Sequence, residues 1–191
     1  MLRAGASPRA VIAAVANQAF DRNYQDQQYG VAALGFEGAP AAFTGADTPG
    51  WQGHATAVGV AVQGNILTGP EVVQTALAAF EENRSRPLAE RLLMALEAGS
   101  EAGGDRRCGK QDALSSYLVV AKPGDRADTP YLKLIVPGQR PGGPNPVRVL
   151  RSQFDRLRAM LKPGASAAHP TIASRITPMP AARMSRHFIR P

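Results

Sequence analysis

The sequence predicts a mixed α+β fold with antiparallel strands, and three observations support this class. Two segments, 29–44 and 114–136, each contain a pair of short apolar runs joined by a turn, which is typical of β-hairpins. Between them lie two segments with apolar residues at helical spacing, and a third helical pattern follows the second hairpin. Helices grouped against antiparallel strands are typical of α+β proteins. The 191 residues are enough for one domain whose core needs no disulfide or metal.

The first element is expected to be an amphipathic helix over residues 7–19. Ser7 can cap its N-terminus, and Pro8 takes the first helical position, where a missing N–H costs nothing. Three branched residues then share one apolar stripe: Val11, Ile12 and Val15. Such a stripe is the core-facing side of a surface helix.

The first hairpin is expected from two short strands, Tyr29–Phe36 and Pro40–Thr44, joined at residues 37–39. A Gly-rich loop over 44–54 then leads into the apolar run Ala55–Val62. This run is too short for a globular helix and is soon followed by a glycine. We therefore expect it to be a single strand that is buried on both faces.

Gln63 and Asn65 place two amides where this strand is expected to pass into a turn. Thr68 and Glu71 have the spacing of a capping box, so a helix is expected from about 70 to 83. The positive end of that helix would point back toward Asn65, where a carboxylate or carbonyl oxygen would find amide donors. The alternative is that both amides only satisfy backbone groups in a tight turn.

The second helix of this pair is expected over Pro87–Ala98, with Gly99 placed to end it. Its leucines repeat at helical spacing: Leu88, Leu92, Leu93 and Leu96. A flexible, charged loop over 103–111 leads into the second hairpin. The strands of that hairpin are expected at Leu114–Ala121 and Tyr131–Val136.

A last amphipathic helix is marked by apolar residues from Val147 to Leu161, and it should pack against the sheet. Four arginines are expected on its exposed side: Arg148, Arg151, Arg156 and Arg158. The following residues have many prolines and little periodicity. We therefore expect one domain over 1–162 and a basic, Pro-rich disordered tail over 163–191.

Charge and composition argue against several classes of function. From Lys162 onward there are five basic residues and no acidic one, which leaves 7 − 5 = +2 of the formal charge for the rest of the chain. The core therefore lacks the clustered basic surface of a nucleic-acid binder. No apolar run is long enough to span a membrane, and the N-terminus has no signal-peptide pattern, so the chain as written is expected in the cytoplasm.

The sequence also gives no reason to expect a metal or a cofactor. The single Cys108 excludes an internal disulfide and a cysteine-based zinc cluster. The chain contains no Walker loop, no HExxH pair, no GxSxG elbow and no carboxylate-rich metal loop. Several large enzyme classes are thereby excluded.

Short motifs nevertheless follow one another in a recognisable order: Ala42-Phe43-Thr44-Gly45, Gly53-His54, Val62-Gln63-Gly64-Asn65-Ile66-Leu67, Gly69-Pro70-Glu71-Val72-Val73, Pro87-Leu88-Ala89-Glu90-Arg91-Leu92-Leu93 and Gly103-Gly104-Asp105-Arg106-Arg107. In this order they resemble the domain-of-unknown-function 1028 family, which is grouped with the Ntn-hydrolase superfamily. The resemblance extends over about residues 2–161. The stretches Asp21-Arg22-Asn23, 26–30 and Arg107-Cys108 look most like the family's exported branch, whose precursors carry signal peptides.

This resemblance implies a four-layer αββα sandwich, with two antiparallel sheets face to face and helices outside. It also implies hydrolysis of a small amide or related acyl compound. In that mechanism an N-terminal Thr, Ser or Cys attacks the carbonyl, and its own α-amine, which titrates near neutrality, acts as the base.

The start of the chain departs from the family pattern. Members of the family begin with a strand of the type Thr-Phe-Ser-Ile-Val, whereas this sequence starts with Met1-Leu2. Internal Thr48, Thr68 and Cys108 do not open an apolar strand, as such a nucleophile must. We therefore expect an N-terminally truncated chain with no catalytic residue, whose unpaired sheet edges cause poor stability or association.

The surviving pocket wall would come from the two loops and the strand before them. Six residues are candidates for contact with a substrate: His54, Gln63, Asn65, Asp105, Arg106 and Arg107. The two amides can form an oxyanion hole or clamp a substrate amide. The aspartate can orient a substrate amine, and either arginine can bind a carboxylate in bidentate fashion or bridge to the aspartate within the loop. For the histidine, a structural hydrogen bond is the alternative.

The sequence thus predicts an Ntn-hydrolase-like protein that is itself inactive, while intact relatives hydrolyse a small amide or acyl compound. The alternative is a non-enzymatic small-molecule-binding or accessory protein that uses the same loop pocket. A third hypothesis is weak binding of nucleic acid or anionic membrane by the basic tail. The expected partners are a small molecule and a second copy of the chain.

Overall fold

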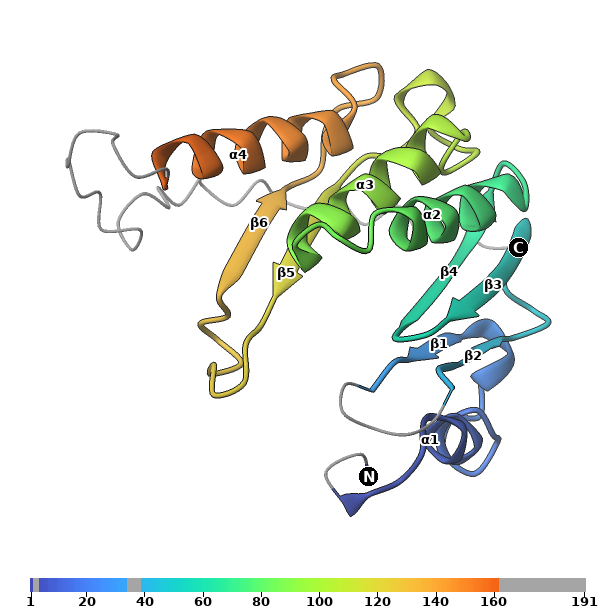
Figure 1. Cartoon of the computed structure of the whole chain (residues 1–191). Coiled ribbons are helices and arrows are strands. Elements are labelled where there is room, and N and C mark those ends of the chain that lie inside the picture. The colour runs from blue at the N-terminus through green and yellow to red at the C-terminus, as the bar shows by residue number, and fades with distance from the viewer. Residues whose placement is uncertain (2–3, 34–38, 162–191) are drawn as a thin grey trace.

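The computed structural model describes residues 1, 4–33 and 39–161. In this part of the chain, four α-helices and three two-stranded antiparallel sheets follow one another (Figure 1), so the mixed α+β class is confirmed. The elements are α1 Pro8–Val15, η2 Tyr24–Asp26, β1 Gln28–Val31, β2 Ala41–Thr44, β3 Trp51–Ala57, β4 Val60–Leu67, α2 Glu71–Glu82, α3 Leu88–Glu101, η3 Gly109–Gln111, β5 Ser116–Val120, β6 Leu132–Val136 and α4 Pro146–Met160. The expected tail over 163–191 and most of the expected junction at 37–39 lie outside the described residues.

The first helix has the predicted cap but ends earlier than predicted. Ser7 Oγ accepts a hydrogen bond of 3.2 Å from the Ala10 N–H. Asn17 then donates to the carbonyls of Ala13 and Ala14, at 3.0 and 2.9 Å. Because the Asn17 amide takes over carbonyls that further helical turns would satisfy, the helix ends at Val15 instead of Ala19.

The segment after the first hairpin folds differently from the prediction of one strand over Ala55–Val62, which is wrong. A turn at Val58 and Gly59 divides this run, and β3 pairs with β4 in an antiparallel hairpin. Gly59 has a φ of +75°, which a branched apolar residue rarely adopts, and it reverses the chain. Small residues with little polarity on both sides of this glycine make the two strands look like one apolar run.

This hairpin also changes the position of the two amides. Gln63 and Asn65 lie inside β4 and on the same face of it, not in a turn before a helix. Residues of β4 alternate in exposure, so the strand is not buried on both faces. Asn65 therefore does not lie in a turn before α2, where the dipole of that helix was expected to act on it.

The capping box expected at the start of α2 does not form. Pro70 is the residue before the helix, and the Thr68 hydroxyl donates instead to the Ala102 carbonyl at 3.3 Å. The Pro70 carbonyl accepts from the N–H groups of Val73 and Gln74, at 3.1 and 3.0 Å, which closes the first turn. The predicted helix itself is confirmed.

Gly99 lies inside α3 and does not end it. A Cβ atom at this position would be 3.3 Å from the Val72 carbonyl oxygen and 3.6 Å from the Ala76 Cβ. The glycine therefore allows α2 and α3 to pack closely, and the helix continues to Glu101.

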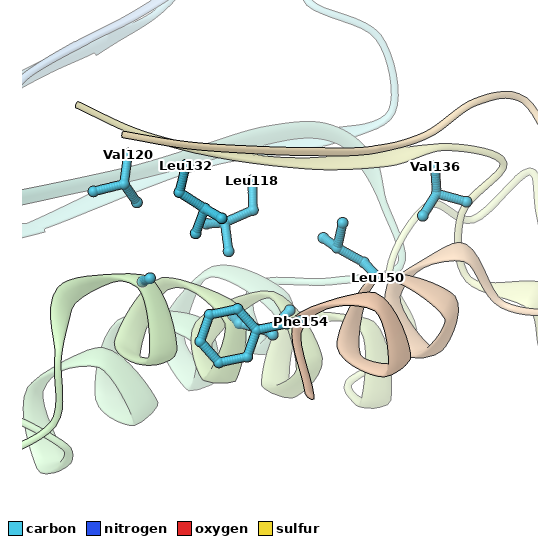
Figure 2. Packing of buried hydrophobic residues seen from close by; sticks show 8 residues of the cluster. Leu118, Val120, Leu132, Val136, Leu150 and Phe154 are labelled. Atoms are coloured by element: carbon cyan, nitrogen blue, oxygen red, sulfur yellow. The ribbon is translucent and has the colours of Figure 1, made fainter. Parts of the chain in front are cut away.

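The last helix packs against the second hairpin, as predicted, and with α3 these elements form the main core. Leu118 and Val120 of β5 and Leu132 and Val136 of β6 lie on the face that the helices cover (Figure 2). Residues from both covering helices complete the cluster: Ala89, Leu93, Leu150 and Phe154. Helices α3 and α4 thus share one face of this hairpin.

The prediction that α4 exposes all its arginines is wrong for Arg151. This side chain is only 23% exposed and forms a bidentate pair with Glu97 of α3, with Nε 2.6 Å from Oε1. The pair holds the two helices together over the core, and it raises the pKa of the Arg151 guanidinium mainly through the hydrogen bond to Glu97.

The hairpins stack in a fixed order but do not form larger sheets. Helix α1 contacts the β1–β2 hairpin, and the β1–β2 hairpin lies against the β3–β4 hairpin. Helix α2 also packs against β3 and β4. The β5–β6 hairpin diverges from β3–β4 beneath α2 and α3 (Figure 1). Among the described residues, the three hairpins are not joined into the two larger sheets that the family resemblance implies.

Candidate functional site

A cleft of about 580 Å³ lies between β4 and β5, with α2 and α3 as its roof. The roof is apolar and includes Val73, Ala76, Leu92 and Leu96. Gln63 lines the β4 wall, and Tyr117 and Val119 line the β5 wall. An apolar cleft with a few polar groups at its rim is the usual form of a small-molecule site.

One end of the cleft is polar, and this polar end consists of Ser100, Asp105, Asp112, Ser115 and Ser116. It lies where α3 ends and the following loop returns to β5. The loop is attached to β4 by a bridge between Leu67 and Asp105, and Arg106 N donates to the Ile66 carbonyl at 2.9 Å. The loop at this polar end is thereby attached to β4 as well as to α3, which it follows in the chain.

A network of side chains fixes this polar end. Asn145, the N-cap of α4, donates to Ser100 Oγ at 2.8 Å and to Asp112 Oδ2 at 3.0 Å. Its Oδ1 accepts from the Val147 N–H at 2.8 Å. Asp112 has a left-handed backbone with a φ of +63°, and its carbonyl accepts from the Asp105 N–H at 2.7 Å. The network couples the loop, α3 and α4.

Sequence reasoning missed Ser100, Asp112 and Asn145. The only sequence signal was Asn145-Pro146 before the apolar stripe of α4, which is typical of a helix start. The contacts join residues up to 45 positions apart and so depend on the tertiary fold.

Gln63 is the predicted amide that the structure leaves accessible. Gln63 is exposed and is one of the residues that line the cleft, and its amide lies beside Gly30 of β1, where a Cβ atom would collide with it. Within the described part of the chain the Gln63 amide forms no hydrogen bond. It can therefore donate to or accept from a ligand in the cleft.

Asn65 and His54 instead join the first two hairpins. Asn65 Nδ2 donates to Gln28 Oε1 at 2.8 Å, and Gln28 Nε2 donates to Thr44 Oγ1 at 3.0 Å and to the Gly64 carbonyl at 2.9 Å. His54 Nδ1 lies 2.9 Å from Thr44 Oγ1. The predicted pair of Gln63 and Asn65 therefore does not converge on one ligand, since the Asn65 amide is already bound.

Asp105 and Arg107 of the loop form the ion pair that is the alternative to substrate binding. Arg107 Nε lies 2.9 Å from Asp105 Oδ1, and the Arg107 N–H donates to the same oxygen at 2.9 Å. The hydrogen bond from Arg107 holds the pKa of the Asp105 carboxyl below its ordinary value. Arg106 is exposed, and neither arginine lines the cleft.

Removal of this ion pair should change the pKa of the Asp105 carboxyl measurably. The folded-state pKa of Asp105 lies below its ordinary 3.8, so its stabilising contribution is present above that value and is lost as the pH falls through the lower folded pKa. Replacement of Arg107 by Gln should move the Asp105 pKa back toward 3.8 in a carboxyl-detected NMR titration. Arg106→Gln is the matched control. An equal shift in both variants would contradict the assigned pair.

The internal residues considered as nucleophiles are poorly placed for that role. The buried Thr48 hydroxyl donates to the Gly45 carbonyl at 2.6 Å, and Thr68 donates to Ala102. Burial, as the largest cause, raises the pKa of the Cys108 thiol and so lowers its thiolate fraction. None of the three lines the cleft.

The described residues hold no group of three or more His, Cys, Asp or Glu side chains suited to a metal ion. Across the same ranges, the helices are too short or too polar to cross a membrane.

Comparison with known proteins identifies a family model and a related structure. The model for the family of unknown function DUF1028 matches residues 1–142. The crystal structure of protein SPO2555 from Silicibacter pomeroyi, which carries the same family model, is similar with a TM-score of 0.64 and 25% identity. The match covers 85% of this chain and 64% of the other, so this chain spans just under two thirds of that protein. No curated protein matches the chain.

Proposed function

Since the chain belongs to the DUF1028 family of unknown function, we propose that it binds a small amide or related acyl compound in the cleft between β4 and β5. The observation that carries this proposal is the exposed Gln63, which lines the wall of an apolar cleft with a polar end. An amide side chain can donate to a ligand carbonyl and accept from a ligand N–H. The apolar roof would hold the rest of the molecule.

The charges around the cleft favour a neutral or cationic ligand. Asp105 and Asp112 are the two acidic residues in its lining among those described, and the lining includes no arginine or lysine. Arg107 is paired with Asp105, whereas the Asp112 contacts are the neutral groups of Ser100 and Asn145. A ligand carboxylate would therefore meet negative charge and find no cation in this cleft.

Only for intact relatives do we propose that the bound compound is also hydrolysed. We propose that the cleft corresponds to one wall of an Ntn-hydrolase-like pocket, in which a nucleophile from another part of the protein would attack the bound amide. The stacking of α1, the first two hairpins and α2 supports this relation to layered αββα folds. Thr48, Thr68 and Cys108 do not line the cleft, so for the chain by itself we propose binding without turnover.

The non-enzymatic alternative uses the same cleft and has specific support. Asn65 is bound to Gln28, and Asp105 is bound to Arg107, so two groups proposed for substrate handling have structural roles. A binding or accessory protein needs only the remaining amide and the apolar roof.

A matched pair of probes tests the binding proposal. N-acetylphenylalaninamide and N-acetylphenylalanine have the same ring and acetyl group, but only the second carries a carboxylate. In NMR titrations of the ¹⁵N-labelled chain, N-acetylphenylalaninamide should bind more tightly than N-acetylphenylalanine. Gln63→Ala should weaken the binding of N-acetylphenylalaninamide by about 2- to 10-fold, because one neutral hydrogen bond is lost.

Gln74→Ala is the matched control, since Gln74 is exposed on α2 and does not line the cleft. It should leave the affinity unchanged. Tighter binding of the carboxylate probe, or the same affinity in wild type and Gln63→Ala, would contradict the proposal. Release of ammonia or acetate from the probe by the chain alone would favour an enzyme over the binding alternative.

A further inference from the structure

Asp112 is a carboxylate of the cleft whose charge is not balanced by a cation of the described chain. It lines the polar end of the cleft together with Asp105, which is paired with Arg107. Among the described residues, Asp112 forms no ion pair with an arginine, a lysine or a histidine. A partly buried carboxylate without a counter-ion is unfavourable, because loss of solvent disfavours the charged form. The fold therefore keeps a negative charge here without a partner of its own.

The two oxygens of this carboxylate have different surroundings. Oδ2 accepts hydrogen bonds from Ser100 Oγ at 3.3 Å and from Asn145 Nδ2 at 3.0 Å. Oδ1 accepts no hydrogen bond from the described chain, and among the same residues no unbonded side-chain oxygen is buried. Oδ2 therefore holds the side chain in place, while Oδ1 is open to solvent or to a ligand.

The charge of Asp112 is not needed for the fold of this loop. Its backbone is left-handed, with a φ of +63°, a conformation that asparagine and aspartate both tolerate. The amide oxygen of an asparagine could also accept the bonds from Ser100 and Asn145. A neutral residue would thus satisfy the same geometry. What aspartate adds is an anion at a fixed position in the cleft.

The backbone around Asp112 is held on both sides. Its N–H donates to the Gly109 carbonyl at 3.1 Å, and its carbonyl accepts from the Asp105 N–H at 2.7 Å. The carbonyl also lies so close to the buried Gly104 that a Cβ atom there would collide with it. An anion that is already ordered binds a cation without a further loss of conformational entropy, which favours affinity.

We propose that Asp112 binds a protonated amine of the ligand, so that the small amide held in this cleft is one that also carries an ammonium group. This inference rests on the ligand site proposed above and names the class of ligand that the site selects. The ammonium group donates to the carboxylate in a charge-assisted hydrogen bond. The described lining of the cleft contains no lysine or arginine to repel the ammonium group, and the apolar roof remains for the rest of the ligand.

Two amides that differ only in the amine test this assignment. Phenylalaninamide carries the amine, whereas 3-phenylpropanamide has the same ring and carboxamide without it. At about pH 6 the amine is protonated, because an α-amine ordinarily titrates at about 7.7. In NMR titrations of the ¹⁵N-labelled full chain, phenylalaninamide should bind about 3- to 10-fold more tightly than 3-phenylpropanamide, since one partly exposed ion pair is added.

Asp112→Asn removes the charge and keeps the size of the side chain. The two probes should then bind with nearly equal affinity, and the affinity for 3-phenylpropanamide should stay close to that of wild type. Asp47→Asn is the matched control, because Asp47 is exposed and outside the cleft and the change in net charge is the same. This control should retain the full preference for phenylalaninamide. Circular dichroism should show that both variants are folded.

The wild-type chain gives a second test that needs no variant. At about pH 9 the amine of the probe is neutral, so the preference for phenylalaninamide should disappear. Asp105 and Arg107 keep their charges over this range, since their hydrogen bond lowers the pKa of the aspartate and raises the pKa of the arginine. The probe 3-phenylpropanamide does not titrate and therefore reports any change in the protein itself.

A preference for phenylalaninamide that survives Asp112→Asn or the rise in pH would overturn the assignment, as would its loss in Asp47→Asn. Equal binding of both amides to wild type at about pH 6 would overturn this inference and leave the proposed ligand site standing. Failure of both amides to bind would overturn the two proposals together.

Discussion

Replacement of Leu93 by Ala is expected to lower the free energy of unfolding by about 2–5 kcal/mol. Leu93 is 0% exposed and lies in the core cluster between α3 and the inner face of the β5–β6 hairpin. Removal of its branched end leaves a cavity under two strands and two helices, because their backbones are fixed by the hairpin ladder and by the pair of Glu97 and Arg151. Urea denaturation followed by circular dichroism measures the change.

Leu88→Ala is the control in the same helix. Leu88 is 42% exposed, so the same change in side chain should cost about 1 kcal/mol or less. If the two variants were equally destabilised, the β5–β6 half of the molecule would not contain the principal core.

The second large effect is expected for Asn145→Ala, at about 2–4 kcal/mol of unfolding free energy. The change removes the N-cap of α4 and the donor that reaches Ser100 and the Asp112 carboxylate. Thermal and urea unfolding measure the loss. Asn83→Ala, which removes a single bond to the Ala79 carbonyl, should cost less.

Asn145→Asp distinguishes the cap from the network. Aspartate preserves the capping oxygen but places a second carboxylate beside Asp112. This variant should be destabilised at neutral pH and should regain part of its relative stability as the pH falls and one carboxyl is protonated. If Asn145→Asp were as stable as wild type at neutral pH, the network would contribute nothing beyond the cap.

The elements that the sequence predicted correctly are those with strong local patterns. Helix α4 and the β5–β6 hairpin show clear periodicity, and Ser7 is a local cap. The region around β3 and β4 was mispredicted because alanine, glycine and threonine give little contrast between core and solvent. There the turn depends on one glycine, Gly59, at positive φ.

The candidate site was only partly predictable, because contacts between distant residues decide it. Gln63 and Asp105 line the cleft as polar residues of the predicted pocket wall. Asn65 binds Gln28, which is 37 positions away, and no local pattern indicates this partner. The cleft itself needs α2 and α3 to hold β4 and β5 apart, an arrangement that only the tertiary structure shows.

The most direct measurement is a set of intermolecular NOEs between N-acetylphenylalaninamide and the methyl-labelled full chain. Ligand binding at the proposed position should give NOEs from the probe to the methyl groups of Leu67 and Val72, which line the cleft near its polar end. Val149 lines a separate hollow beside α4 and should give none. NOEs to Val149 alone, or to no cleft residue while the probe is bound, would contradict the assignment of this cleft as the ligand site.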